Sequence, residues 1–212
     1  MQPRSALGVT VDERQRFRIA AISDGYPHYV HLICERLFWA MFEDPCRCSI
    51  SSTDHYQAAV ASALLGIEPT LKRAYDQATM KDTDGYEEVL WAVVDHSDLI
   101  RPIDAIYESY LQLMDFLEDE PLDRATFVNR LNSLKTAGFG KILVSDRRGW
   151  YKFRENITRG YVRLRAEDQG IQLALDVSPG PVTSTSRQRG ARKSRRGTTV
   201  AQWRSTRNPT GF

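Results

Sequence analysis

The stretch GFGKILVSDRRGWYKFRENITRGYVRLRAED, residues 138–168, decides the predicted fold because its hydrophobic period changes along its length. The period is two in residues 141–145 and 150–154, which predicts two strands. Residues 146–149, Asp-Arg-Arg-Gly, predict the turn that joins those strands into a β-hairpin. Apolar residues then return at helical spacing, which predicts a closing helix over 157–168.

Three helices are predicted before this hairpin, over 86–96, from Pro102 to about 117, and over 123–137. Gly138 and Gly140 stop the third helix. Three helices, a hairpin and a helix follow one another in a winged helix-turn-helix domain, which we predict over residues 84–170. In that arrangement the third helix is the recognition helix, and the hairpin is the wing.

Upstream, residues 1–80 predict a small helical bundle. Helices are expected over 10–22, over 26–42, from the cap at Thr53 or Asp54 to Leu64, and over 69–79. Phe38 and Trp39 widen the apolar face of the second helix, so we expect it to be buried on most sides. The polar segment 81–85 is the predicted domain boundary.

The net charge of +2 conceals a strong asymmetry along the chain. Residues 1–122 carry 21 acidic and 10 basic side chains, whereas residues 123–170 carry 5 acidic and 11 basic ones. Residues 178–212 carry 8 basic side chains and no acidic one. This segregation predicts that the C-terminal half meets a polyanion and that the N-terminal half does not.

The segment 171–212 predicts a disordered, arginine-rich tail, since from Ser178 it has almost no apolar content and no periodicity. No apolar run is long enough for a membrane span, and the N-terminus lacks the apolar core of a secretion signal. The three cysteines, Cys34, Cys46 and Cys48, are an odd number. We therefore expect a cytoplasmic protein without a disulfide framework and with no membrane partner.

No catalytic or metal-binding constellation emerges from the residue pattern. His28 and His31 lie three apart on a predicted helix, but no third ligand accompanies them on that face. Cys46 and Cys48 lack the two-residue spacing of zinc and redox motifs. The chain also has no G-x-S-x-G nucleophile motif. The expectation is a protein that is not an enzyme by itself and holds no metal.

Two blocks carry a family resemblance. Residues 23–33, SDGYPHYVHLI, resemble the start of the "sensor 2" helix in the lid of AAA+ ATPases of the initiator or STAND-like type. Residues 149–156, GWYKFREN, with Tyr161-Val162-Arg163, resemble the wing and closing helix of the winged-helix domain that follows that lid. The resemblance covers residues 10–168 and implies nucleotide contacts from Gly25, Pro27 and His28.

The chain departs from that family in its nucleotide chemistry. It has no P-loop: its only Gly-Lys pair is Gly140-Lys141, and Lys135 stands where the earlier glycine would be. His28 stands where the resemblance implies an arginine that reaches the γ-phosphate. The expectation is a lid and winged helix that bind no cofactor in isolation. ATP would be contacted only together with a nucleotide-binding core, on another chain or lost from this one.

The basic side chains of the predicted winged helix give the strongest indication of function. Arginine and asparagine read guanine and adenine edges in the major groove of DNA, and wing cations reach phosphates or the minor groove. Lys141, Arg154, Arg159 and Arg163 add positive charge to the same half. The predicted DNA-binding residues are Arg124, Asn129, Arg130, Lys135, Arg147, Arg148 and Lys152.

The sequence therefore favours a DNA-binding, regulatory C-terminal module of an AAA+ or STAND-type ATPase. Its expected partners are double-stranded DNA and a nucleotide-binding core or another protein. The alternative is a protein-interaction module, in which the winged helix docks a partner and the acidic helical bundle mediates assembly.

Overall fold

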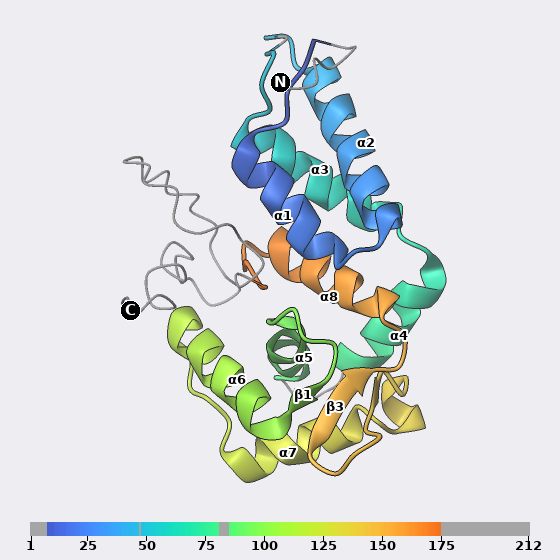
Figure 1. The fold of residues 1–212 in the computed structure, drawn as a ribbon, viewed down its shortest axis with the longest axis vertical. Helices are drawn as coiled ribbons and strands as arrows, with labels where there is room; N and C mark the ends of the chain where they lie inside the picture. The colour runs from blue at the N-terminus through green and yellow to red at the C-terminus, as the bar shows by residue number, and fades with distance from the viewer. Residues whose placement is uncertain (1–7, 47, 81–84, 175–212) are drawn as a thin grey trace.

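The computed structural model describes residues 8–46, 48–80 and 85–174, which form a mainly helical fold with a small antiparallel sheet (Figure 1). The predicted boundary, except Gly85, and the predicted tail, except residues 171–174, lie outside these residues. The elements in chain order are α1 Glu13–Ser23, α2 Pro27–Glu43, α3 Thr53–Leu65, α4 Pro69–Thr79, α5 Tyr86–Val94, β1 Arg101–Pro102, α6 Ile103–Leu117, α7 Arg124–Ser133, the 3-10 helix η1 Ala137–Phe139, β2 Leu143–Val144, β3 Trp150–Phe153 and α8 Ile157–Asp168.

The predicted helices are present, and the bounds of α4 and α8 agree with the expected ones. The prediction for α7 is wrong at its end, because the helix stops at Ser133 rather than at residue 137. Hydroxyl groups take part in this ending: Ser133 Oγ donates to the Asn129 carbonyl and Thr136 Oγ1 to the Ser133 carbonyl. Such side-chain bonds compete with the helical ladder for carbonyl oxygens.

The sheet has the strand order β1-β3-β2, and both pairings are antiparallel. Strand β1 was not expected from the sequence, because two residues carry no periodicity. Arg101 pairs with Tyr151 across the sheet, and Leu143 of β2 pairs with Phe153. The buried Arg101 guanidinium donates to the Ala92 and Ala105 carbonyls at 2.7 and 3.0 Å, which fixes β1 against α5 and α6.

Helix α8 lies at the centre of the molecule, between α1 and α3 on one side and α5 on the other (Figure 1). Among the described residues, one continuous hydrophobic cluster joins Ile33 of α2, Leu90 of α5 and Leu164 of α8. The last helix of the described residues therefore connects the elements predicted as a bundle with those predicted as a winged helix.

Two arginines of α8 point inward, contrary to the expectation that they add to an exposed basic surface. Arg159 and Arg163 are 1% and 2% exposed. Arg159 Nε donates to Asp24 Oδ2 at 2.6 Å, and Arg163 Nη1 donates to Asp24 Oδ1 at 2.7 Å. Both guanidinium groups also donate to the His96 carbonyl. Burial is tolerated because one carboxylate and several carbonyl oxygens receive the charged donors.

A second buried ion pair joins α8 to α1. Arg18 Nη2 donates to Glu167 Oε2 at 2.7 Å, and both residues are nearly inaccessible to solvent. Tyr56 of α3 donates its hydroxyl proton to Glu167 Oε1 at 3.0 Å. Burial, together with the neighbouring Glu167 carboxylate, raises the pKa of Tyr56 well above its ordinary value, so the phenol stays a donor.

The expectation that α2 is buried on most sides is wrong. Trp39 is 53% exposed, Phe42 is 77% exposed and Phe38 is 36% exposed. The buried side of α2 carries Tyr29, Leu32, Ile33, Leu37 and Met41, which fill the contact with the rest of the bundle. These residues already form one complete apolar stripe along the helix, so the aromatic side chains of Phe38, Trp39 and Phe42 are left exposed to solvent.

Gly160 of α8 packs directly against the Tyr29 ring of α2. A Cβ atom at this position would lie 2.4 Å from Cε2 of the buried Tyr29 ring. The Tyr29 hydroxyl donates to the Ile157 carbonyl at 2.7 Å, so the ring is held against α8. Only a residue without a side chain fits between the two helices.

Replacing Gly160 with alanine is expected to destabilise the protein by about 1–3 kcal/mol through overpacking. This loss exceeds the gain of roughly 0.5–1 kcal/mol that alanine brings to a helix interior. Gly138→Ala is the matched control, because a Cβ there would meet no atom within 4 Å. Urea unfolding followed by circular dichroism measures both variants. Equal stability of the two would contradict the close packing of α8 on Tyr29.

Candidate nucleic-acid interface

Helix α7 is anchored by its buried face and presents a polar face to solvent. Asp123 caps the helix by accepting hydrogen bonds from the N–H groups of Ala125 and Thr126. The Thr126 hydroxyl and backbone N–H hold the pKa of the Asp123 carboxyl below its ordinary value. Phe127 fits between two aromatic rings of α6, with ring centroids 5.0 Å from Tyr107 and 4.9 Å from Tyr110.

Because the Phe127 side is buried, the opposite side of the helix faces outward. Ala125 and Asn129 are exposed on α7, and Asn132 follows one turn further on. The predicted readout residue Asn129 is therefore placed where it can reach a ligand.

The hairpin carries the exposed arginines. Its turn is closed by the Trp150 N–H donating to the Arg147 carbonyl at 3.0 Å and by the Ser145 hydroxyl donating to the same carbonyl at 2.9 Å. Gly149 adopts a φ of +78°, a left-handed conformation that favours glycine. The Arg147 guanidinium lies 5.2 Å from the Trp150 ring centroid, and Arg148 is exposed beside it.

The hairpin and α7 are joined directly. Tyr151 of β3 donates its hydroxyl proton to Asn132 Oδ1 of α7 at 3.2 Å. Lys135 Nζ lies 5.3 Å from the centroid of the same Tyr151 ring. These contacts fix the hairpin relative to the exposed side of α7. A cavity of about 270 Å³ lies beside the hairpin, lined by Ile100, Asp146, Arg147, Trp150 and Lys152.

Arg130 does not belong to this surface, which corrects the sequence-based expectation. It is 9% exposed, and its guanidinium lies 4.9 Å from the centroid of the Tyr86 ring of α5. Its Nη1 atom is buried and has no hydrogen-bond partner among the described residues. The position falls on the core side of α7, one turn after Phe127, where a long side chain packs its stem against apolar neighbours.

Two further predicted cations have acidic neighbours. Arg124 forms an ion pair with Asp104 and lies 5.3 Å from the Tyr107 ring centroid. Lys152 forms an ion pair with Asp146 of the hairpin turn. These surface pairs are weak and exchange readily for other anions. In contrast, neither Arg147 nor Arg148 forms an ion pair within the part of the chain that the structure describes.

The predicted nucleotide-contacting residues lie elsewhere, on the turn between α1 and α2. Gly25 has a φ of +81° and follows Asp24, which is also left-handed at +50°. Pro27 begins α2, and His28 follows it with its ring edge-on to Tyr29 at 5.5 Å. Gly25, Pro27 and His28 are all exposed. Sequence reasoning missed the most firmly held group of this turn, the Asp24 carboxylate, which binds Arg159 and Arg163.

Two other classes of site, a metal centre and a membrane span, have no candidate among the described residues. No group of three or more histidine, cysteine, aspartate and glutamate side chains lies close enough there to hold a metal ion. None of the described helices combines the length and apolarity needed to cross a bilayer.

No protein-family model, curated protein or solved structure matches the chain. Function is therefore inferred from the arrangement of the residues alone.

Proposed function

We propose that this protein is a DNA-binding and regulatory module whose residues 85–170 form a winged helix, with α7 as the recognition helix and the β2–β3 hairpin as the wing. The element order α5-β1-α6-α7-β2-β3 and the strand order β1-β3-β2 support this assignment. Helix α7 has 10 residues, which corresponds to about 15 Å of helix. An α-helix with its side chains is roughly 10–12 Å in diameter, which fits a major groove roughly 12 Å wide.

The observation that carries the proposal is the position of Arg147 and Arg148 at the tip of a hairpin that is fixed to α7. Both arginines are exposed, and no carboxylate within the described residues neutralises them. Arginines at such a position bind phosphate oxygens and set the register of the protein on the duplex. Asn129 then faces the groove, where its amide can bond the N6 and N7 atoms of adenine. Lys135 adds a further cation between the two elements.

The regulatory part of the proposal concerns the α1–α2 turn. Its likeness to an AAA+ lid and the exposure of Pro27 and His28 support contact with a nucleotide-binding core that another polypeptide supplies. The neighbouring Asp24 is held by Arg159 and Arg163 of α8. A shift of the turn on nucleotide binding would therefore displace α8, which packs against α5 of the winged helix. This contact chain is a route by which ATP on the core changes DNA binding.

Fluorescence anisotropy with a labelled duplex tests the proposal. The full chain and a chain ending at Val177 are titrated at low and at physiological salt. Both should bind, and the affinity of both should fall steeply as salt rises, because phosphate contacts release counterions. Binding by the full chain alone would assign the affinity to the arginine-rich segment beyond residue 177 and would refute the winged-helix proposal.

A protein-docking role for the winged helix is the second candidate. Arg130 is buried, and Arg124 and Lys152 pair with Asp104 and Asp146, so three of the six predicted DNA-binding cations are engaged within the protein. A surface of mixed charge with an exposed hairpin suits a protein partner as well. In the anisotropy experiment this role predicts no binding by the chain ending at Val177 at either salt concentration.

A further inference from the structure

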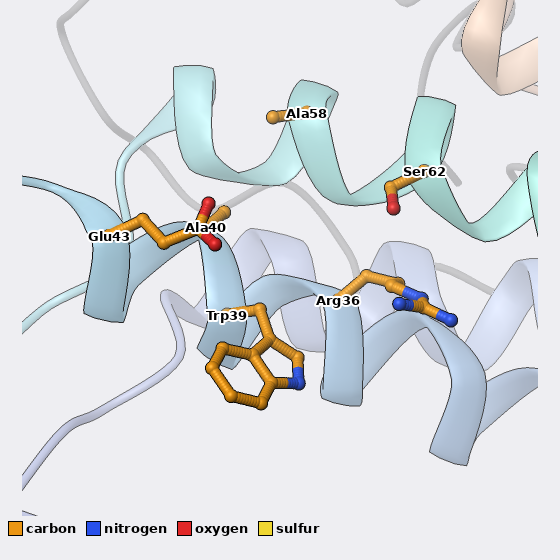
Figure 2. A pocket seen from close by; sticks show the side chains of 6 residues that line it. All are labelled: Arg36, Trp39, Ala40, Glu43, Ala58 and Ser62. Atoms are coloured by element: carbon orange, nitrogen blue, oxygen red, sulfur yellow. The ribbon is translucent and has the colours of Figure 1, made fainter.

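A groove between α2 and α3 lies away from the α7–hairpin surface and forms a cavity of about 430 Å³ (Figure 2). In Figure 2 the indole of Trp39 points outward between Arg36 at one end and Glu43 at the other. The small side chains of Ala40 on α2 and of Ala58 and Ser62 on α3 complete the lining of the groove.

The exposed aromatic residues beside this groove are arranged as a patch. The rings of Trp39 and Phe42 make an edge-to-face contact with centroids 5.9 Å apart, and Phe38 lies one turn before Phe42. Clustered exposed aromatics on one helix face are characteristic of protein-binding surfaces. The acidic character of residues 1–122 disfavours a nucleic acid as the occupant.

The two ends of the groove carry opposite charges. Arg36 is half-buried at one end, and its guanidinium forms no ion pair within the described residues, so its charge has no carboxylate neighbour there. Glu43 is exposed at the other end. Seven residues separate the two on α2, which is two helical turns, or roughly 10.5 Å. The midpoint between them falls at Trp39 and Ala40.

The charges along this groove are self-complementary, because a second copy in the opposite direction would place acidic ends against basic ends. We propose that the groove binds a second copy of the chain, with the two α2 helices antiparallel across a two-fold axis near Trp39 and Ala40. Rotation about that axis places Arg36 opposite the partner's Glu43, and Glu43 opposite the partner's Arg36. The Trp39 indole then covers the small residues of the partner's groove. A two-fold interface makes each such contact twice, so one favourable pair counts double.

The oligomeric state of the full chain tests this proposal, by sedimentation velocity over a range of concentrations. The wild type should reach twice the 24.2 kDa chain mass. Arg36→Glu and Glu43→Arg should each weaken the dimer at least about tenfold, since each puts like charges opposite one another at both contacts. Lys72→Glu, an exposed position on α4, is the control and should leave the dimer unchanged.

Restored pairing makes the test specific to the antiparallel arrangement. The double variant Arg36→Glu with Glu43→Arg should dimerise again. An equimolar mixture of the two single variants should form a heterodimer, because one then carries two acidic and the other two basic groove ends. Circular dichroism checks that each variant is folded. A wild type that stays monomeric at every concentration, or a dimer that neither single reversal weakens, would overturn the proposal.

Discussion

Replacing Asp24 with asparagine is expected to destabilise the protein by about 3–5 kcal/mol, because it removes the negative charge of the carboxylate that two buried guanidinium groups share. Arg159 and Arg163 are 1% and 2% exposed, and both donate to the Asp24 carboxylate within 2.7 Å. Asparagine tolerates the left-handed backbone at this position, so the change isolates the charge. For a chain of this size the melting temperature should fall by on the order of 10 °C.

Asp98→Asn is the matched control for this experiment. The Asp98 side chain is 69% exposed, although its backbone carbonyl accepts a hydrogen bond from Arg159. Removing its carboxylate should change stability by less than about 0.5 kcal/mol. Urea and thermal unfolding, both followed by circular dichroism, measure the two variants side by side. Equal stability of Asp24→Asn and the wild type would show that Asp24 does not hold α8 to the α1–α2 turn.

Reversing the charge at both Arg147 and Arg148 is expected to abolish salt-dependent binding to duplex DNA. The two arginines are exposed at the hairpin tip, so glutamate there meets phosphate oxygens with like charge. The milder change of both to alanine should reduce the slope of log K against log salt by about 2, one for each lost phosphate contact. Anisotropy titrations of the chain ending at Val177 measure both effects. The folded state should be unaffected, since neither side chain is buried.

Lys72 and Arg73 provide the matched control, since they are a second adjacent pair of exposed basic residues, on α4. Glutamate at both positions changes the net charge by the same amount as the hairpin variant. If DNA binding is a matter of overall charge alone, the two double variants will lose affinity equally. The proposed interface instead requires that the hairpin variant lose binding and the α4 variant retain most of it.

The sequence identifies most secondary structure here because its signals are local. Pro69 begins α4 at the first helical position, where its missing N–H costs nothing. The change of period after Gly140 marks the hairpin. Asn129 is exposed because it falls outside the apolar stripe of α7, and Arg147 and Arg148 are exposed because they lie in the turn of the hairpin.

The sequence does not reveal which charged side chains are buried. Arg159 and Arg163 were expected at the surface, but their acceptor, Asp24, stands more than 130 residues earlier in the chain. The residue pattern of a single helix does not indicate an ion-pair partner that is so distant in the sequence. The same limit applies to Trp39, which local hydrophobicity places inside although the core is already filled by its neighbours on α2.

The indole N–H signals of the tryptophans test the proposed interface most directly. In a ¹⁵N-labelled chain ending at Val177, Trp150 reports on the hairpin, Trp39 on the α2–α3 groove and the buried Trp91 on the core. A duplex is added at low salt, and the three signals are followed by NMR. The proposal predicts that the Trp150 signal shifts while those of Trp39 and Trp91 stay in place. A stationary Trp150 signal, with or without movement of Trp39, would contradict it.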